Sequence, residues 1–285
     1  MYNDFEAIFN IYLFRKTQMI GVKALENKTL RVLSIGNSFS VDTMEHLAKV
    51  ATSFGYTDIV LGNLYIGGCS ISLHHTNFKE DLGVYKFYLN NGDGWSETPS
   101  FKIGDAVKKE DWDFISIQHG SKNGSRYTNP ECYELLPHLV EMVKKTAPEK
   151  TKILFNMAWV AEPYSNRLEI TEWGGNKELL FKRMCEITSE FVEKSCGIDF
   201  VCPTGTAIMN ACETEIRDAL YRDGFHLSYD IGRFIAALTF FAKLTNADIE
   251  SVPLSFDNLS EREMKIAIES VKNAIKNPYT IIKSN

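Results

Sequence analysis

The sequence lacks the long apolar runs and the leading charges that mark membrane-bound and secreted proteins. No stretch approaches the ~18 consecutive apolar residues that a membrane-spanning helix needs. Asp4 and Glu6 interrupt the apolar residues at the start, and Arg15 and Lys16 follow them, whereas a secretory signal places its positive charges first. As written, the sequence predicts a cytoplasmic protein with no membrane partner, and an extracytoplasmic location would imply a misassigned start.

An excess of positive charge is also missing. Lys and Arg number 31 against 37 for Asp and Glu, which gives a net charge of −6. Proteins that bind nucleic acids need a concentrated basic face, so we expect no nucleic-acid partner. Hydrophobic residues at 44% and charged residues at 24% are ordinary values for a globular protein and exclude disorder. The sequence carries no indication of an oligomeric state.

Closely spaced cysteine pairs are absent as well. The chain has 6 cysteines but no Cys-x-x-Cys pair, which disfavours both a disulfide scaffold and a zinc site. We therefore expect reduced thiols and no bound metal. The cysteines are Cys69, Cys132, Cys185, Cys196, Cys202 and Cys212.

What the sequence does contain is an alternation of strand-like and helix-like segments. Short apolar strands without clean alternation are typical of parallel sheets that are covered on both faces. We therefore expect an α/β fold: a three-layer, doubly wound (flavodoxin-like) sandwich around a central, mostly parallel, five-stranded sheet. The expected strands are 30–35, 58–66, 114–118, 152–158 and 199–201, and the expected helices are 41–54, 130–146, 177–196, 231–244 and 261–275.

The chain shows no linker and no internal repeat. At roughly 150 residues per domain, 285 residues allow two small domains or one large one. We expect an N-terminal arm at 1–29 and a single domain at 30–285. An insertion is expected near 73–110, where the pattern is irregular. Within it, a strand-like segment at 84–89 and a turn cluster at 90–94 favour a hairpin.

Candidate catalytic residues follow the predicted strands, at the sheet edge where ligands of such folds bind. Ser38 comes after the first strand, within Gly-Asn-Ser-Phe-Ser, and either caps a helix or acts as a nucleophile. Gly68 follows the second strand and offers either a tight turn or an unobstructed backbone N–H. After the third strand come Gln118 and Asn123, whose side-chain amides can donate to a negative oxygen.

An acidic residue and a histidine form a second candidate pair nearer the C-terminus. Asp223 stands three residues before His226 in the segment Asp-Gly-Phe-His-Leu-Ser. A carboxylate in this place can bond one ring nitrogen and leave the other free to act as a general base. The alternative is that Asp223 caps a turn and His226 packs as a neutral core residue.

Taken in order, these residues resemble the SGNH (GDSL-type) hydrolase superfamily of serine esterases. The resemblance covers about residues 30–245, and the Gly-Asn-Ser-Phe-Ser and Asp-Gly-Phe-His segments resemble a bacterial branch often found beside carbohydrate-active enzymes. It implies that Ser38 is the nucleophile, His226 the general base and Asp223 the residue that orients the imidazole. It also implies oxyanion donors in the backbone N–H groups of Ser38 and Gly68, and no cofactor.

Two positions depart from the family pattern. The family's third oxyanion donor is an Asn side chain two residues after a glycine, and here that position is Lys122. Asn123 lies one residue further on, a spacing similar to that of sialate O-acetylesterase relatives. We favour Asn123 over Gln118 as the third donor. The other departure is Asn37, where the family name has Asp, and this residue lies outside the catalytic set.

The resemblance implies hydrolysis of a short-acyl ester, with an O-acetyl group on a carbohydrate as the expected substrate. Trp159, after the fourth strand, and Tyr164, in the following loop, either offer aromatic faces to a sugar ring or serve as packing anchors. No continuous apolar segment indicates a groove for a long acyl chain. A lipase or thioesterase type of hydrolase nevertheless stays an alternative.

Two interpretations from other functional classes compete with the esterase. One is a nucleotide or phosphate binder on the same fold, but the chain lacks both GxGxxG after its first strand and GxxxxGK[ST] anywhere. The other is a catalytically idle carbohydrate-binding protein. The presence of Ser38, Asp223 and His226 together favours an active hydrolase over this second interpretation.

Overall fold

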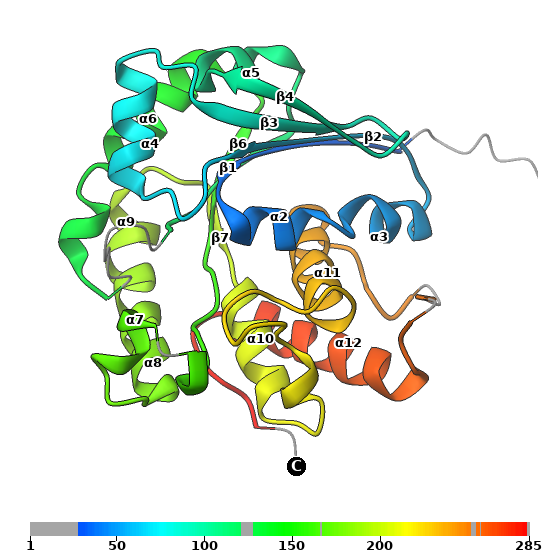
Figure 1. Cartoon of the computed structure of the whole chain (residues 1–285). Helices are drawn as coiled ribbons and strands as arrows, with labels where there is room; N and C mark the ends of the chain where they lie inside the picture. The colour runs from blue at the N-terminus through cyan, green and yellow to red at the C-terminus, as the bar shows by residue number, and fades with distance from the viewer. Residues whose placement is uncertain (1–27, 121–127, 166, 252–254, 257, 284–285) are drawn as a thin grey trace, which may run out of the picture.

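Within the residues that the structure describes, the sheet at the centre of the molecule contains seven strands. The computed structural model describes residues 28–120, 128–165, 167–251, 255, 256 and 258–283. In this part of the chain the strand order is β4-β3-β2-β1-β5-β6-β7, as Figure 1 shows. The strands are β1 (Lys28–Gly36), β2 (Tyr56–Tyr65), β3 (Tyr85–Asn90), β4 (Trp95–Phe101), β5 (Phe114–Ile117), β6 (Lys152–Asn156) and β7 (Phe200–Cys202).

Five of these strands are parallel and two form an antiparallel hairpin. The parallel strands β2, β1, β5, β6 and β7 follow the order 2-1-3-4-5 known from flavodoxin-like sheets. The prediction of a mostly parallel α/β sheet is confirmed, but its count of five strands is wrong. The hairpin of β3 and β4 pairs with β2 and extends the sheet. Strand β4 is polar and exposed between its two ends, so no apolar run marks it in the sequence.

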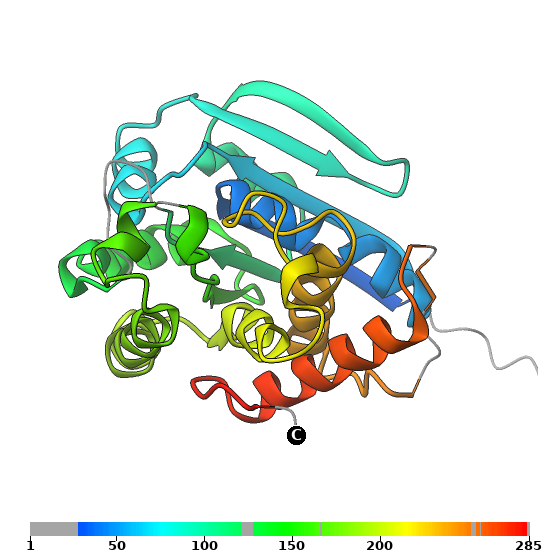
Figure 2. The ribbon, with the colours of Figure 1, turned by 60° about the horizontal axis from the view of Figure 1, so that its bottom comes forward.

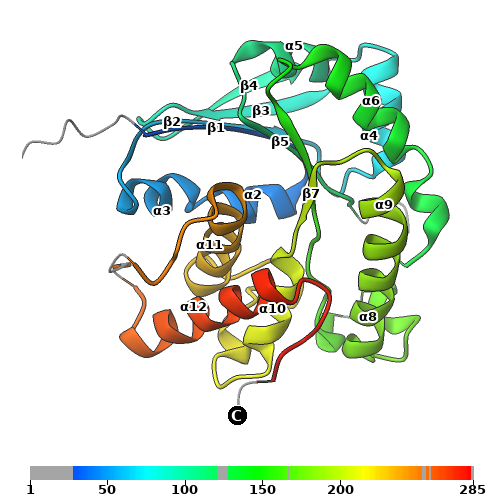
Figure 3. The same ribbon diagram turned by 180° about the vertical axis from the view of Figure 1, so that it is seen from behind.

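Helices cover both faces of the sheet. In Figures 1 and 3, α2, α3 and α11 lie on one face, and α4, α5 and α6 lie on the other. Figure 2 shows α12 alongside α10 and α11, with which it is in contact. None of the helices in the described ranges is long and apolar enough to cross a bilayer. The helices are α2 (Ser38–Met44), α3 (Leu47–Ser53), α4 (Ile71–Lys79), α5 (Ile103–Lys109), α6 (Leu136–Thr146), α7 (Leu168–Thr171), α8 (Lys177–Ile187), α9 (Glu193–Ser195), α10 (Thr204–Cys212), α11 (Ile231–Thr245) and α12 (Glu261–Lys276).

Strand β1 brings the chain to the middle of the sheet's carboxyl edge. Its residues from Val32 onward are buried without alternation, as expected for a strand that is covered on both faces. The chain continues from β1 to β2 on one side, whereas β5 lies on the other side. Open α/β sheets bind ligands at such a reversal of strand order, so the residues that follow β1 and β5 lie where a site is expected.

The helices differ from the sequence expectation mainly in their boundaries. The segment expected as one helix at 41–54 is two helices, since α2 begins at Ser38 and α3 begins at Leu47. Helix α12 agrees with the expected 261–275 and begins with a capping box between Ser260 and Glu263. Helix α10 was not expected, because all nine of its residues are buried and no amphipathic period marks it.

The outer edge of the sheet is irregular. The register between β3 and β4 shifts between Tyr85 and Phe87. On the β4 side this shift falls beside Pro99 and Ser100, and Ser100 has a positive φ of 56°. A bulge of this kind bends and twists an edge strand.

Two buried histidines lie under the face that α4 covers. His74, in α4, has its Nδ1 2.8 Å from the hydroxyl of Tyr85. His119 is the second residue after β5, and its ring packs edge-on against Tyr133. Burial, with a smaller contribution from His119, lowers the pKa of His74 to about 3. Burial lowers the pKa of His119 to about 4. Both side chains are therefore neutral in the folded protein at ordinary pH.

These histidines predict a loss of stability in acid. Below pH ~6.5 the unfolded chain binds protons at His74 and His119 that the folded protein does not bind. The free energy of unfolding should therefore fall by about 1.4 kcal/mol per pH unit for each histidine between pH ~6 and ~4.5. Urea denaturation at several pH values measures this slope. In His74→Gln and in His119→Gln, the slope should decrease by the contribution of one histidine, about 1.4 kcal/mol per pH unit. Equal slopes in the wild type and both variants would contradict the lowered pKa values of the two histidines.

Candidate active site

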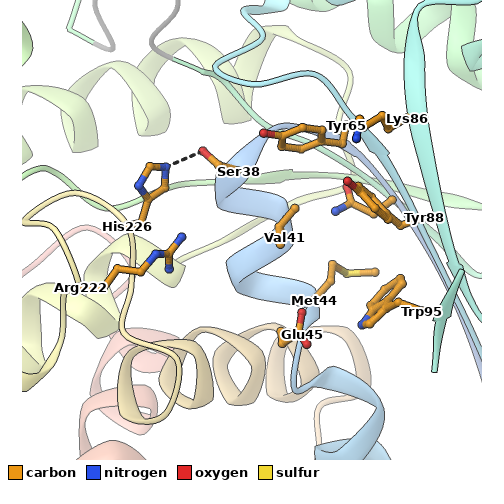
Figure 4. A pocket seen from close by; sticks show the side chains of 11 residues that line it. Ser38, Val41, Met44, Glu45, Tyr65, Lys86, Tyr88, Trp95, Arg222 and His226 are labelled. Carbon is orange, nitrogen blue, oxygen red and sulfur yellow. Dashed lines mark hydrogen bonds between the residues drawn. The ribbon is translucent and has the colours of Figure 1, made fainter. Parts of the chain in front are cut away.

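Ser38 is the first residue of α2 and directly follows the turn at the end of β1. The side chain of Asn37 caps the helix, since its Oδ1 accepts a hydrogen bond from the backbone N–H of Phe39 at 3.0 Å. The first N–H groups of a helix have no acceptor within that helix. Ser38 lines two cavities at the carboxyl edge of the sheet, and Figure 4 shows it in the larger of the two.

Ser38, His226 and Asp223 form one hydrogen-bonded series. The Oγ of Ser38 lies 3.0 Å from Nε2 of His226, the contact drawn as a dashed line in Figure 4. The other ring nitrogen, Nδ1, lies 2.6 Å from Oδ2 of Asp223. The second carboxylate oxygen accepts hydrogen bonds from the backbone N–H groups of Phe225, at 2.9 Å, and His226, at 2.7 Å. A serine, an imidazole and a carboxylate are thus brought together across 188 residues of chain.

The environment of Asp223 favours its charged form. Burial by itself raises the pKa of this carboxyl, but the hydrogen bonds from the side chain and backbone of His226 and from the backbone of Phe225 outweigh it. The pKa of Asp223 is therefore lower than the ordinary value for aspartate. An ionised carboxylate can only accept hydrogen bonds, so Nδ1 of His226 carries the proton and Nε2 is left to face Ser38.

Asp42 connects the helix of the serine to the loop of the histidine. It lies one turn into α2, and its side chain is 0% exposed. Its carboxylate accepts hydrogen bonds from Nη1 of Arg222 at 2.9 Å, from Nε of Arg233 at 2.8 Å and from the backbone N–H of Leu227 at 2.9 Å. Two of these partners directly flank the Asp-x-x-His segment, so the buried carboxylate holds that segment against α2.

The turn that contains Gly68 is held beside Ser38 by close backbone packing. Gly68 has a φ of +63°, a left-handed conformation that favours glycine. Gly120, in the loop after β5, is pressed against this turn: a Cβ there would lie 2.3 Å from the carbonyl oxygen of Cys69 and 2.6 Å from the carbonyl carbon of Gly68. Asn37 Nδ2 donates to the same Cys69 oxygen at 3.2 Å. These contacts fix the turn, and both glycines line the smaller cavity.

The two side chains considered for a third oxyanion donor have different outcomes. Gln118 is buried, its Nε2 donates to Oδ1 of Asn37 at 3.0 Å, and its Oε1 accepts from Nδ2 of Asn156 at 3.3 Å. It lines neither cavity beside Ser38, and its hydrogen bond instead holds the side chain of Asn37 in place. Asn123 lies outside the described residues, so its role as the third donor stays a prediction.

The aromatic residues expected to contact a sugar lie away from the cavities. Trp159 is 0% exposed, and its Nε1 donates to the backbone oxygen of Phe225 at 2.8 Å. Its ring packs on Phe39 with centroids 4.7 Å apart. It is therefore a packing anchor beneath the site and is out of reach of a substrate. Tyr164 is 65% exposed and lies against Gly224 but lines neither cavity, so its contact with a sugar stays a prediction.

Two cavities meet at Ser38 and His226. The larger one, of about 670 Å³, lies between α2 and the hairpin of β3 and β4 (Figure 4). The smaller one, of about 310 Å³, lies on the side of Gly68. Tyr65, at the end of β2, lines both and marks the boundary between them. In the described ranges, no group of three or more His, Cys, Asp or Glu side chains is arranged to hold a metal ion.

Sequence reasoning missed Asp42 and the aromatic residues of the hairpin. No sequence signal marked Asp42, because its neighbours one turn away on α2 are mostly polar and gave no reason to expect a buried position: Ser38, Phe39, Glu45 and His46. Tyr88 and Trp95 carried no signal either. They border a turn cluster in an irregular segment, and only the pairing of the hairpin with β2 places them near Ser38.

The network around Asp42 predicts a large effect on stability. In Asp42→Asn, the Arg222 and Arg233 guanidinium groups lose their shared negative partner in a buried setting. The free energy of unfolding should fall by about 3–5 kcal/mol. Glu45→Gln is the matched control, because Glu45 is 35% exposed and 3.8 Å from Arg233, and it should cost less than about 1 kcal/mol. Urea denaturation measures the free energy of unfolding of both variants. Equal losses would contradict the role of Asp42 in holding the Asp-x-x-His segment against α2.

Comparison with known proteins gives a family match over most of the chain. Residues 31–274 match the family model DUF4886, described as a domain of unknown function. No curated protein sequence matches the chain. An acetylxylan esterase from Geobacillus stearothermophilus is 14% identical with a TM-score of 0.49, and the match covers 77% of this chain and 96% of that one. A GDSL-like lipase from Bacteroides thetaiotaomicron is 13% identical with a TM-score of 0.42, covering 76% and 87%.

A much stronger likeness is found with a DUF4886 protein of known structure from Bacteroides uniformis. The two chains are 30% identical, and their structures superpose with a TM-score of 0.84. The match covers 90% of this chain and 98% of that one. Sequence and structure thus agree on the assignment, and the chain belongs to the DUF4886 family.

Proposed function

We propose that the protein is a serine esterase that hydrolyses short-acyl esters, with O-acetyl groups on carbohydrates as its substrates. The observation that carries the proposal is the series of hydrogen bonds from Ser38 through His226 to Asp223, with the serine hydroxyl open to two cavities. This arrangement suits acyl transfer, because a base within hydrogen-bond distance activates a serine and a third group orients the base.

In the proposed reaction, the Ser38 hydroxyl attacks the ester carbonyl carbon while Nε2 of His226 accepts its proton. Asp223 keeps the ring in the productive tautomer and stabilises the imidazolium that forms. The negative oxygen of the tetrahedral intermediate lies between the backbone N–H groups of Ser38 and Gly68, with Asn123 as the proposed third donor. Each such donor is worth about 3–4 kcal/mol in the transition state. His226 then protonates the leaving alcohol, and water hydrolyses the acyl-enzyme.

The smaller cavity supports a preference for short acyl groups. It opens beside the proposed oxyanion donors and is closed in by backbone at Gly67, Gly68 and Gly120. The rings of Phe39 and Phe225 also line it, so it offers a limited apolar surface. An acetyl group fits such a space, and the few apolar side chains that line it offer little surface to a long alkyl chain.

Replacing the proposed nucleophile should abolish ester hydrolysis. We expect the wild type to hydrolyse p-nitrophenyl acetate faster than p-nitrophenyl octanoate, and Ser38→Ala to reduce turnover of the acetate by at least about 1000-fold. Ser40→Ala is the matched control, because this neighbouring hydroxyl is buried, with two acceptors of the protein in reach, the backbone oxygen of Asn37 at 2.7 Å and Oδ1 of Asn63 at 2.8 Å. This variant should keep most of the activity. Unchanged hydrolysis in Ser38→Ala would overturn the proposal. A wild type without any hydrolysis would favour the idle carbohydrate-binding protein.

Replacing Asp223 should slow catalysis without weakening substrate binding. In Asp223→Asn the amide can donate to Nδ1 and stabilise the wrong tautomer of His226, so kcat should fall by about 10⁴-fold with little change in KM. Asp218→Asn, an exposed acidic residue of the same region, serves as the control and should keep wild-type kinetics. Steady-state kinetics with p-nitrophenyl acetate test this prediction. A loss of less than about tenfold in Asp223→Asn would show that His226 is oriented by another group.

A further inference from the structure

One face of the hairpin of β3 and β4 forms the far wall of the larger cavity (Figure 4). In the pairing register, Tyr65 lies opposite Lys86 and Asn63 lies opposite Tyr88. Side chains alternate between the two faces of a strand, so alternate residues of β2, β3 and β4 share one face, turned toward α2. The residues of this face that line the cavity are Asn63, Tyr65, Lys86, Tyr88 and Trp95.

Three half-buried aromatic rings lie along this face. The rings of Tyr65 and Tyr88 meet edge to face, with centroids 5.9 Å apart and planes at 64°. Figure 4 shows Tyr65 nearest to Ser38 and Trp95 further along α2, beside Met44. The apolar surface therefore begins at the reacting serine and continues away from it. A group attached to the reacting ester can reach all three rings without leaving the cavity.

The rim of the cavity is polar, which argues against an alkyl chain as its occupant. Glu45, Lys86 and Arg222 line it together with the aromatic rings. An alkyl chain laid over these groups would remove them from water without offering hydrogen bonds in return. A pyranose ring suits both kinds of surface, because its C–H face packs on an aromatic ring and its hydroxyl groups point outward to polar partners.

The charges that surround the cavity are balanced within the protein. Asp42 and Glu45 face Arg222 and Arg233, with separations of 2.9 Å for Asp42–Arg222, 2.8 Å for Asp42–Arg233 and 3.8 Å for Glu45–Arg233. Lys86 pairs with Glu97 at 3.0 Å. Two carboxylates thus balance two guanidinium groups, and a third carboxylate balances the lysine. No excess positive charge among these residues is left to attract a carboxylate or a phosphate on the ligand.

We infer that the larger cavity binds the alcohol part of the substrate, and that this part is a neutral sugar ring. The inference rests on the esterase activity proposed for Ser38. The acyl group then occupies the smaller cavity, and Tyr65 lies between the two parts of the ester. Tyr88 and Trp95 become specificity residues, because they contact the sugar and lie apart from Ser38, His226 and the proposed oxyanion donors.

A comparison of two substrates tests this inference kinetically. The probes are ethyl acetate, whose alcohol part is too small to reach Tyr88 and Trp95, and acetylated methyl β-D-glucopyranoside. In Trp95→Ala and in Tyr88→Ala, kcat/KM for the glucoside should fall at least tenfold more than kcat/KM for ethyl acetate. Equal losses on the two substrates, or no loss on the glucoside, would overturn the inference.

A matched control and a charged substrate sharpen the test. Thr98→Ala changes an exposed residue of β4 on the opposite face from Trp95, and it should leave kcat/KM for both substrates within about twofold. The wild type should prefer the acetylated glucoside at least tenfold over an equally acetylated methyl β-D-glucuronoside. A preference for the glucuronoside would show that the cavity selects an anion, which contradicts the balance of charges.

Binding to an inactive variant separates this inference from the proposed activity. Isothermal titration calorimetry of Ser38→Ala with the acetylated glucoside should show saturable binding, and Ser38→Ala/Trp95→Ala should bind at least tenfold more weakly. A protein that binds sugar in this way can still fail to hydrolyse p-nitrophenyl acetate. Weaker binding by the double variant, combined with no hydrolysis by the wild type, would reject the proposed esterase activity and leave the sugar site standing. Normal hydrolysis with equal binding by the two variants would reject the sugar site alone.

Discussion

The site depends on one buried carboxylate. Asp42 is fully enclosed, and its two oxygens satisfy two guanidinium groups and one backbone N–H from a segment that lies far away in the sequence. Without it, α2 and the Asp-x-x-His segment would share few directional contacts near Ser38 apart from the one between the serine and the imidazole. A distance of 3.0 Å between two flexible side chains cannot hold two segments in register. A buried ionic network can hold them, because any other relative position of the two segments would leave charged groups unpaired and away from water.

The same logic explains why the proposed reaction needs little rearrangement. The turn at Gly68 is fixed by the close approach of Gly120 and by the amide of Asn37. The imidazole of His226 is fixed by one carboxylate oxygen of Asp223, and the other oxygen accepts hydrogen bonds from two backbone N–H groups. A catalytic geometry that exists before the substrate arrives spends less binding energy on ordering the protein. Each of these contacts uses backbone or short side chains, which lose little conformational entropy.

Much of this arrangement could be expected from the sequence, for a definite physical reason. Parallel strands end at one edge, so Ser38 after β1 and Gly68 after β2 had to lie near each other once the strands were recognised. The sequence could not predict contacts that depend on distant partners. Asp42 finds Arg222 and Arg233 across 180 and 191 residues, and no local pattern announces such a pairing. Trp159 shows the same limit, because its position after β6 left open whether the ring contacts a sugar or serves as a packing anchor, and packing on Phe39 buries it.

The outer strand of the sheet has a consequence for how the molecule behaves in a crowded solution. An unpaired strand edge is a template on which another chain can form a ladder of hydrogen bonds. Among the described residues β4 is such an edge, but Pro99 offers no N–H, the bulge at Ser100 twists the backbone, and the strand is exposed and polar between its ends. These features discourage edge-to-edge association. The hairpin can therefore form a wall of the larger cavity without promoting aggregation through its outer strand.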